Sequence, residues 1–541
     1  FKNTNCILVW GVNPPATWGV VAAEIMDARQ RGASLIVVDP YMSEIAAKAD
    51  IWLQIRPGTD TALALGLMHI ICKEELHDIN FIETWTNGFL QLKNQLKLYD
   101  PEKTAAITGV PIKLLYLAAR EFATAKSACI QRCVALDQLH DSVQACRSVS
   151  LLSVITGNIG IPGGNNVDSK RGEISQNSHE FINHIRLDDE LLKQRIGYQE
   201  YPLLCGNLSA VPSAHMPSLW ETIITEKPYP IKAAMIFGSN ASISYANSDR
   251  VVTALNKLDF LVVADMFLTE TAKKADIVLP VTSWLERDNI ISSFQCSPEY
   301  TLAQRKVATV EGARSDVDII CQLAEKLGIQ EYFWNDTREM LDSLLSPLEI
   351  TFEEFAEKKR LHVPIKFREY EKGGFNTPSK KIEIYSTLLE NEGSAPIPCY
   401  IEPFQSPVST PETAKNYPIV LTTGGRVPFF RHTENRENEH LMAMSPKPIT
   451  TINPKTAKKY QIENDMKILI ETPTGSTVSW AKCDEGIKED VIQVMPGWQD
   501  EHNINKTIAW DKCAAGMGTV PMRGVLCRVR PYRSSSIAGK Q

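Results

Sequence analysis

The sequence predicts an α/β protein in which two related, doubly wound parallel-sheet domains are followed by an all-β barrel. The first observation is a duplication: residues 39–53 read DPYMSEIAAKADIWL, and residues 265–279 read DMFLTETAKKADIVL. Each copy also follows an apolar run that ends in glycine, ILVWGVN at 7–13 and AAMIFGSN at 233–240. A long-period repeat of this kind indicates two related domains rather than a solenoid. After a Pro- and Ser-rich stretch at 393–416, the pattern changes to short strands separated by turns.

Length and charge limit the class of protein. The 541 residues are enough for roughly three or four domains, and the 43% hydrophobic and 22% charged content is ordinary for a globular protein. The formal net charge of −7 and the lack of a basic run argue against a nucleic-acid partner. No run of about 18 apolar residues exists, so we expect no membrane span.

The 12 cysteines are scattered without a CxxC pair. Cys129 and Cys133 lie closest, in ACIQRCV, where the alternation favours buried thiols on a strand over metal ligation. Unpaired cysteines favour a reducing compartment, so we expect a cytoplasmic protein and leave a periplasmic location open. Because the chain starts at Phe1, we interpret it as a fragment or a processed chain.

The first repeat unit has the pattern strand, loop, helix, strand. An apolar run covers 6–10, helical spacing covers 17–29, and a β-branched run at 33–38 ends on Asp39. Gly11 permits a tight turn, and the helix after it offers free backbone N–H groups to a phosphate. Asp39 is placed to accept hydrogen bonds from ribose hydroxyls. One copy is a weak sign of dinucleotide binding, and two copies with matching Gly, Asn and Asp strengthen it.

The rest of the first domain, which we assign to 1–170, is mainly helical. Asp60 stands at a helix start, where an ordinary N-cap and a nucleotide contact are equally supported. The loop at 157–166 is rich in glycine, so it can turn sharply or approach a ligand, but it lacks the lysine of a P-loop. The other predicted elements are a loop at 56–60, helices from Thr61 and over 81–98, 112–125 and 148–156, and a strand at 127–136.

Beyond the first domain, the pattern changes three times along the chain. We expect a polar, irregular connecting segment at 171–228, a second doubly wound domain at 229–392, a linker at 393–416 and a barrel at 417–541. The predicted elements are helices at 316–327 and 351–358, strands at 417–422, 467–471, 477–481 and 491–495, and a hairpin turn at 473–475.

In order and spacing, these motifs resemble the large subunit of the molybdopterin-dependent oxidoreductases, the dimethyl sulfoxide reductase family, over essentially the whole chain. The run at 18–32, with a tryptophan at its start, is most similar to the acetylene-hydratase-like branch. The matching pieces are Gly11-x-Asn13-Pro14, Val38-Asp39-Pro40, Ala49-Asp50-Ile51-Trp52-Leu53, Arg56-Pro57-Gly58-Thr59-Asp60, Thr156-Gly157-Asn158-x-Gly160-x-Pro162-Gly163-Gly164, Ala275-Asp276-Ile277-Val278-Leu279-Pro280, Trp284-Leu285-Glu286 and Asn453-Pro454-x-Thr456-Ala457.

The resemblance implies a double-psi type of barrel and two molybdopterin guanine dinucleotides that hold molybdenum or tungsten through dithiolenes. Each repeat would bind one dinucleotide, and the barrel would close over both pterins. Phosphates and pterin heteroatoms need many donors, which glycine backbone, asparagine and arginine provide. By residue match, the implied cofactor-binding residues are Gly11, Asn13, Asp39, Arg56, Gly58, Asp60, Gly160 and Gly163 in the first domain, Gly238, Asn240, Asp265 and Thr269 in the second, and Thr423, Gly424, Gly425, Arg426, Asn505 and Arg523 in the barrel.

The chain departs from the family pattern in three places. The family's N-terminal domain carries a cysteine cluster for a [4Fe–4S] centre, and a Cys, selenocysteine, Ser or Asp ligates the metal. Both would lie before Phe1, so we assign no metal ligand and expect the cluster in a missing N-terminal segment or in an iron–sulfur electron-transfer subunit. Asp-Pro-Arg-x-Thr becomes Asp39-Pro40-Tyr41-Met42-Ser43, which removes a possible phosphate-binding arginine. Glu-x-x-Gly-Thr becomes residues 286–290, as in hydratase-like relatives, which weakens the case for a nitrate- or formate-type substrate.

Three residues are candidates for chemistry on a small-molecule substrate. Arg426 matches a position near the metal and could polarise a substrate oxygen, and His432 on the same loop could move a proton. A loop histidine bonded to backbone is the competing interpretation of His432. Trp18 could wall a substrate pocket, or it could simply pack at a helix start.

Three functions agree with these motifs. The leading hypothesis is a molybdenum or tungsten redox enzyme that moves two electrons, with oxygen-atom or hydroxyl transfer. Non-redox hydration at tungsten is the second. The third is a scaffold subunit that keeps the fold without the metal, which the retention of Asp39, Asp60 and Asp265 argues against.

Overall fold

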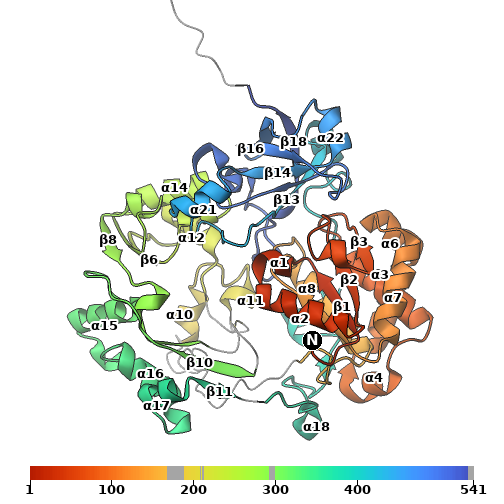
Figure 1. Ribbon diagram of the computed structural model, residues 1–541, viewed down its shortest axis with the longest axis horizontal. Helices are drawn as coiled ribbons and strands as arrows, with labels where there is room; N and C mark the ends of the chain where they lie inside the picture. Colours follow the sequence, from red (N-terminus) through yellow and green to blue (C-terminus); the bar gives the residue numbers. More distant parts are fainter. Residues whose placement is uncertain (167–187, 207–208, 210–212, 292–298, 363, 534–541) are drawn as a thin grey trace, which may run out of the picture.

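Three bodies surround a common centre in the computed structural model (Figure 1). The first, coloured red and orange, carries the N-terminus, the second is mainly green, and the blue barrel lies beside both. The described residues are 1–166, 188–206, 209, 213–291, 299–362 and 364–533.

The first body is built on a parallel sheet in the order β3-β2-β1-β5. The chain runs outward from β1 on one side and places β5 on the other, so the strand order reverses between β1 and β5. In open α/β sheets, ligands bind outside the carboxyl ends of the strands at such a reversal. The strands are β1 (Cys6–Trp10), β2 (Ser34–Val38), β3 (Ile51–Leu53) and β5 (Ala128–Arg132).

Helices cover both faces of this sheet, which explains why every residue of β1 is buried. Ile7 and Val9 pack with Ile25 on the face covered by α2, and Leu8 and Trp10 belong to the core on the opposite face. The helices are α1 (Pro14–Thr17), α2 (Gly19–Gln30), α3 (Asp60–Lys73), α4 (Ile79–Trp85), α5 (Phe89–Leu96), α6 (Pro101–Thr108), α7 (Ile112–Thr124) and α8 (Ser142–Ile155).

Several predicted boundaries in this body are wrong. The helix expected at 81–98 is divided into α4 and α5, because Gly88 is left-handed (φ 94°) and β4 (Thr86–Asn87) pairs with β12 (Ile382–Glu383). The apolar pattern also misses α6, whose start is capped by the Asp100 side chain ahead of a proline. Helix α8 starts earlier than expected, and β5 ends earlier.

The second body repeats the parallel arrangement with three strands in the order β6-β7-β8. One face packs on α12 and α14 through Trp220, Val251 and Leu261, while Ile277 and Val278 on the edge strand remain exposed. An antiparallel sheet, β11-β10-β9, follows. The elements are α12 (Met216–Thr225), β6 (Ala233–Phe237), α13 (Ala241–Ser244), α14 (Ser248–Lys257), β7 (Phe260–Asp265), β8 (Ile277–Pro280), β9 (Asn289–Ile291), β10 (Tyr300–Gln304), α15 (Asp316–Leu327), α16 (Thr337–Leu345), α17 (Phe352–Lys358) and β11 (Arg360–His362). Next in the chain come α18 (Tyr370–Gly373) and α19 (Thr387–Asn391), and Tyr370 of α18 packs in the core of the first body.

The connecting segment expected to be irregular at 171–228 is partly helical. It contains α10 (Asp189–Lys193), α11 (Pro202–Cys205) and α12, and the remainder of that prediction falls partly outside the described residues. Proline at the first helical turns of α11 and α12 explains these starts, because proline favours that position.

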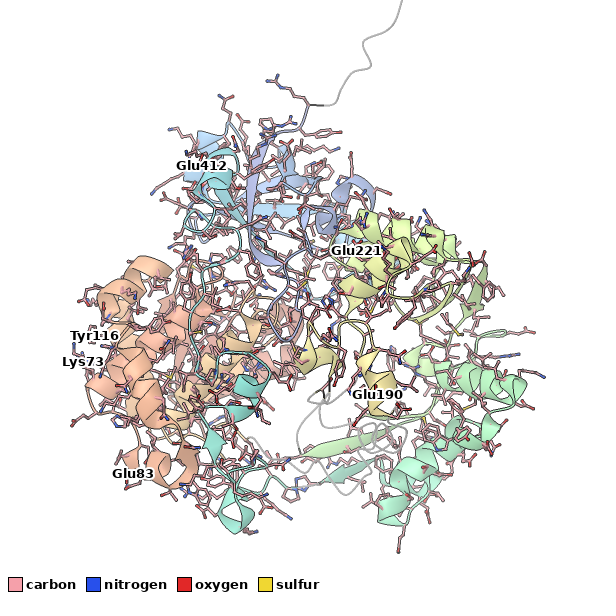
Figure 2. The ribbon with its side chains drawn as sticks, turned by 180° about the vertical axis from the view of Figure 1, so that it is seen from behind. Lys73, Glu83, Tyr116, Glu190, Glu221 and Glu412 are labelled. Atoms are coloured by element: carbon pink, nitrogen blue, oxygen red, sulfur yellow. The ribbon has the colours of Figure 1, made fainter. Side chains whose placement is uncertain are left out.

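The third body is a closed six-stranded barrel in the order β13-β17-β14-β16-β15-β18. Pattern reading misses β14 and β18, which complete the closure. Glu221 of α12 lies beside the barrel (Figure 2) and accepts a hydrogen bond from the indole of Trp510 at 3.2 Å. The elements are α20 (Pro411–Asn416), β13 (Ile419–Thr423), α21 (Glu439–Met444), β14 (Ile449–Ile452), α22 (Pro454–Lys459), β15 (Lys467–Glu471), β16 (Ser476–Cys483), β17 (Val491–Val494) and β18 (Arg523–Pro531). None of the helices within the described ranges is long and apolar enough to cross a membrane.

Candidate functional site

The duplication extends to backbone hydrogen bonds at the carboxyl ends of the strands. The N–H of Gly11 donates to Val38 O at 2.9 Å, and the N–H of Gly238 donates to Ala264 O at the same distance. Both glycines are left-handed, with φ of 61° and 53°, a conformation that costs glycine little. The two β–α turns therefore have one geometry.

One retained polar residue of the repeat has a structural function. Oδ2 of Asp50 accepts the N–H of Leu35 at 2.8 Å, and Oδ2 of Asp276 accepts the N–H of Leu261 at 2.7 Å. Each carboxylate stands at the end of a connection, just before β3 or β8, and fastens it to the preceding strand, β2 or β7. Retention of a polar residue in both copies is consequently not by itself a sign of ligand binding.

Asp39 lies at the carboxyl end of β2, beside the reversal point. Its carboxylate accepts the N–H of Tyr41 at 2.9 Å and the hydroxyl of Ser43 at 3.4 Å. Burial raises the pKa of Asp39 to about 7, against the opposing effects of the Tyr41 hydrogen bond and the charge of Arg523. This carboxylate is held in place and still keeps acceptor capacity.

Asp60 is not an N-cap, so that interpretation is wrong. Thr59 holds the cap position of α3, and Asp60 is the first helical residue. Its Oδ1 accepts the indole N–H of Trp10 at 2.8 Å. Burial raises the pKa of Asp60 to about 6, with a further contribution from the charge of Asp141.

Asp141 is a candidate that sequence reasoning misses, because it sits in a polar turn without a recognisable motif. Its side chain is buried and accepts the hydroxyl of Thr61 at 2.6 Å. Its other oxygen lies 3.9 Å from Nε2 of His140 and has no hydrogen-bond partner among the described residues, and neither does Nδ1 of His140. Burial raises the pKa of Asp141 to about 7, so Asp39, Asp60 and Asp141 all titrate near neutrality.

Arg523 of β18 brings the barrel to these carboxylates. It donates to Thr423 O at 2.6 Å and to Oε1 of Gln138 at 3.3 Å, while its Nε has no partner within the described chain. Burial lowers the pKa of Arg523 to about 10, and the nearby charge of Arg426 lowers it further, while the charges of Asp39 and Asp60 oppose the shift. Gln138 is a second residue that sequence reasoning misses.

The turn after β13 presents the predicted glycines and Arg426. Gly425 is left-handed (φ 70°), a conformation that favours glycine, and a Cβ on Gly424 would lie 2.6 Å from the Gln493 amide, which would have to shift. Across the described residues, Arg426 has no hydrogen bond or ion pair of its own. Burial, followed by the charge of Arg431, lowers its pKa. Two arginines close to each other without a paired carboxylate suit an anionic ligand.

The remaining two catalytic candidates have less support. His432 is left-handed (φ 52°) and exposed, and its carbonyl accepts Nε–H of Arg436 at 3.3 Å. Partial burial of the imidazole lowers the pKa of His432, and the nearby charge of Arg426 lowers it further. Trp18 is 38% exposed at the start of α2, where its backbone N–H donates to Pro14 O at 2.7 Å.

The two asparagines after the repeat glycines are bonded differently. Nδ2 of Asn13 donates to Glu44, and its buried Oδ1 has no partner in the described structure. Oδ1 of Asn240 accepts both the N–H (3.2 Å) and the hydroxyl (2.9 Å) of Thr271. Asn13 consequently keeps a free acceptor, whereas Asn240 fixes its own loop.

Further second-body candidates show the same mixture of roles. Oδ1 of Asp265 accepts the N–H of Phe267 at 3.2 Å, as Asp39 accepts that of Tyr41, and Thr269 caps the following turn through Ala272 N–H at 3.2 Å. Asn505 of the barrel donates to Ile243 O at 2.6 Å, and its buried Oδ1 has no partner in the described chain.

Four predicted first-domain residues serve the architecture. Arg56 pairs with Glu402, and Gly58 packs against Pro403. Gly160 exchanges backbone hydrogen bonds with Asn165 and Arg368, and a Cβ on Gly163 would meet Asn3 O at 2.4 Å. These last two glycines therefore lie beside the start of β5, and the structure does not bring them to Asp39.

The donors and acceptors around Asp39 and Arg523 fit a phosphorylated nucleoside. Oδ1 of Asn13, Oδ1 of Asn505 and Nε of Arg523 are buried without a partner in the described chain, at a cost of about 1–3 kcal/mol each unless a ligand pairs them. Carboxylates at the strand ends accept ribose or base hydrogens, and the arginines suit phosphate. Within the described ranges, no three His, Cys, Asp or Glu side chains come together as a metal site.

Two parallel α/β units with matched turns, closed by a barrel, with carboxylates at the strand ends and arginines that form no ion pair, define a nucleotide-cofactor-binding protein. Comparison with known proteins gives the family. Residues 1–326 match the molybdopterin oxidoreductase model, and residues 419–522 match the molydopterin dinucleotide binding domain. The chain belongs to the molybdopterin oxidoreductases, in the dimethyl sulfoxide reductase family of enzymes.

Individual relatives extend along most of the chain. Acetylene hydratase of Syntrophotalea acetylenica is 33% identical over 92% of this chain and 71% of its own length. F420-dependent formate dehydrogenase 1 subunit alpha of Methanococcus maripaludis is 28% identical over 98% of this chain and 76% of its own length. The solved structure of acetylene hydratase from Pelobacter acetylenicus superposes with a TM-score of 0.92 at 30% identity, over 98% of this chain and 78% of that chain.

Proposed function

We propose that the chain, a catalytic subunit of its family, binds two molybdopterin guanine dinucleotides with molybdenum or tungsten. The observation that carries the proposal is the matched geometry of the two turns at Gly11 and Gly238, each followed by a strand-end aspartate. Asp39 and Asp60 would accept hydrogen bonds from one guanosine, and Asp265 and Thr269 would face the other. Arg523 and Asn505 would bind phosphate or pterin groups from the barrel.

When bound, this cofactor supplies a metal centre capable of two-electron redox chemistry and of oxygen or hydroxyl transfer. For a small substrate, we propose that Arg426 orients and polarises an oxygen atom. Its unpaired guanidinium supports that role. His432 would take up a proton, because its lowered pKa keeps the imidazole neutral at pH 7. Trp18 would exclude water from the substrate. Its side chain is 38% exposed and is therefore accessible to a small molecule.

Metal and pterin analysis of the purified protein tests the proposal. Near-stoichiometric molybdenum or tungsten with about two guanine dinucleotides per chain is the expected result. A folded protein that takes up neither cofactor nor metal under conditions that load a relative would instead identify a scaffold subunit.

Non-redox hydration is the second candidate, and the match to acetylene hydratase in sequence and structure favours it. An assay with and without a reduced viologen donor separates the two reactions. Turnover of a substrate panel only with the donor indicates a redox enzyme, and water addition to an alkyne without net electron consumption indicates a hydratase.

We also propose an iron–sulfur partner, either an electron-transfer subunit or a separate N-terminal segment with a [4Fe–4S] centre, in the cytoplasm. Relatives named as subunits of formate dehydrogenases support this partner. Fractionation of the source cells, followed by iron and acid-labile sulfide analysis of the native complex, tests it. A native protein without iron would contradict the proposal.

A further inference from the structure

The sequence assigns Arg56 to the nucleotide, but its guanidinium is already engaged. NH1 and NH2 of Arg56 bind the two carboxylate oxygens of Glu402 at 2.7 and 2.9 Å. Its Nε donates to Ile107 O at 2.9 Å, and NH2 also reaches the Tyr400 hydroxyl at 3.2 Å. Each of the three nitrogens has a protein partner, so little donor capacity remains for a phosphate.

Glu402 belongs to a segment, residues 395–406, that we call the strap. Pattern reading assigns it to a linker, yet it is fixed to the first body along its length. Arg147 donates to Pro396 O at 2.8 Å, and the N–H of Tyr400 donates to the Tyr99 hydroxyl at 2.9 Å. Nε2 of His140 bonds Ile401 O at 2.6 Å. The strap is thus a built part of the first body.

The strap contacts the loop that ends on Asp60. Arg56 begins this loop, and the hydroxyl of Thr59 donates to Arg56 O at 2.7 Å. Gly58 lies so close to the strap that a Cβ there would be 2.8 Å from Pro403 Cγ. Movement of Glu402 or Pro403 would therefore be transmitted to the start of α3, which places the Asp60 carboxylate.

The ion pair is held more firmly than a surface pair. Both side chains keep only 20% of their surface accessible, and the contact is bidentate. Burial alone would raise the pKa of Glu402, but hydrogen bonds from Arg56, Ser406 and Tyr400 together lower it to about 2. Glu402 is accordingly ionised at neutral pH.

We propose that Glu402 is a positioning residue for the guanosine site: it fixes Arg56, and through the loop it fixes Asp60, so Arg56 is not a phosphate ligand. This inference rests on the proposed function, because it assumes a guanine nucleotide at Asp60. The strap then contributes to nucleotide binding indirectly, and Arg56 positions Asp60 instead of binding the phosphate.

Binding of two probes to the purified, cofactor-free 541-residue chain tests the inference. GDP presents guanosine and phosphate, and inorganic pyrophosphate presents phosphate alone. We expect Glu402→Gln and Arg56→Gln each to weaken GDP binding by about tenfold, a usual effect for outer contacts of a site, and to leave pyrophosphate binding unchanged. The double variant should be no weaker than the weaker single variant, because both changes break one interaction.

Arg120 and Glu74 provide a matched control on the same body. This pair is also bidentate, at 2.8 and 2.7 Å, but lies on the outer side beside Tyr116 (Figure 2). Glu74→Gln should leave the binding of both probes at the wild-type level. Thermal unfolding of every variant confirms that folded proteins are compared.

The outcomes separate two kinds of failure. A wild-type chain that binds no GDP overturns the nucleotide site and, with it, this inference. A wild-type chain that binds GDP overturns the inference alone if Glu402→Gln has no effect, or if Arg56→Gln weakens pyrophosphate as much as GDP. Should Glu402→Gln not fold, Glu402→Asp keeps the charge on a shorter side chain. Weaker GDP binding by Glu402→Asp then supports the inference, and unchanged GDP binding overturns it.

Discussion

The indole of Trp10, the last residue of β1, donates a 2.8 Å hydrogen bond to the carboxylate of Asp60, the first residue of α3. Trp10 is fully buried, so its position is set by the sheet core. The bond therefore fixes the Asp60 carboxylate, at the carboxyl end of the sheet, to the buried core of the first body. It also stabilises the ionised form of Asp60, because the indole can only donate.

Replacing Trp10 by phenylalanine should weaken both stability and nucleotide binding. The free energy of unfolding is expected to fall by about 2 kcal/mol through lost packing and a lost hydrogen bond. Without the donor, the pKa of Asp60 should rise above about 6, so GDP binding should require a higher pH. Denaturant unfolding and GDP titrations at pH 6, 7 and 8 measure the two effects. Trp220→Phe is the control, since this buried indole has no partner in the described structure; an equal pH shift there would contradict the explanation.

Replacing Asp39 by asparagine should stabilise the cofactor-free protein while impairing nucleotide binding. A carboxyl whose folded pKa is raised from 3.8 to about 7 contributes stability below pH 4 that is lost as the pH rises through 7. The variant avoids that loss, so its melting temperature should exceed that of the wild type at pH 8 and approach it near pH 4. Asp50→Asn should instead lower the melting temperature, because Asp50 binds a backbone N–H. A lower melting temperature for Asp39→Asn at pH 8 would rule out this assignment.

Replacing Arg426 by alanine should leave the cofactor-free fold intact or stabilise it. The guanidinium has no hydrogen bond in the described chain, and its neighbours Arg431 and Arg523 are also cationic. Removing the guanidinium removes a buried charge and its repulsion by the neighbouring arginines, so the melting temperature should stay equal or rise. In the loaded enzyme, kcat should fall by about 100-fold or more. Arg29→Ala removes the 2.8 Å pair with Asp50 and should not raise the melting temperature. Clear destabilisation by Arg426→Ala would mean that the arginine is structural.

Tyr41 joins the loop after β2 to the barrel. Its hydroxyl donates to Asp484 at 3.0 Å, and Met42 N–H donates to Gly486 O at 2.9 Å. Tyr41→Phe should lower the free energy of unfolding by about 1 kcal/mol. Although burial opposes the shift, hydrogen bonds from Gly486 and Tyr41 lower the pKa of Asp484 below 3.8, so the effect should fade only well below that pH. Chemical denaturation at pH 2.5 and pH 7 measures the difference, and an effect independent of pH would contradict a bond to the carboxylate.

Local chemistry explains why much of the fold is predictable from the sequence. The repeat at Asp39 and Asp265 combines glycine turns, β-branched runs and strand-end acids, whose physics is local, and the two units match in structure down to single hydrogen bonds. Strands β14 and β18 are missed because their pairing partners are distant in sequence, and the stability of a strand depends on such pairing.

The site is less predictable because its members meet only in three dimensions. Asp141 and Glu402 stand in polar segments with no periodicity, and their burial follows from packing of distant elements. Two contacts of this kind cannot be read from local sequence: Asp60 pairs with an indole rather than capping its helix, and Arg56 meets a carboxylate far along the chain.

The strap also decides where this chain can be divided. A truncation at residue 392, the boundary that composition suggests, would remove Glu402, the ion-pair partner of Arg56. It would also break four hydrogen bonds that residues 395–401 make with side chains of the first body, those of Gln144, Arg147, Tyr99 and His140. A shortened chain meant to keep that body whole should therefore extend through the strap to about residue 410. Composition therefore predicts a domain boundary beside a segment that hydrogen bonds fix to the first body.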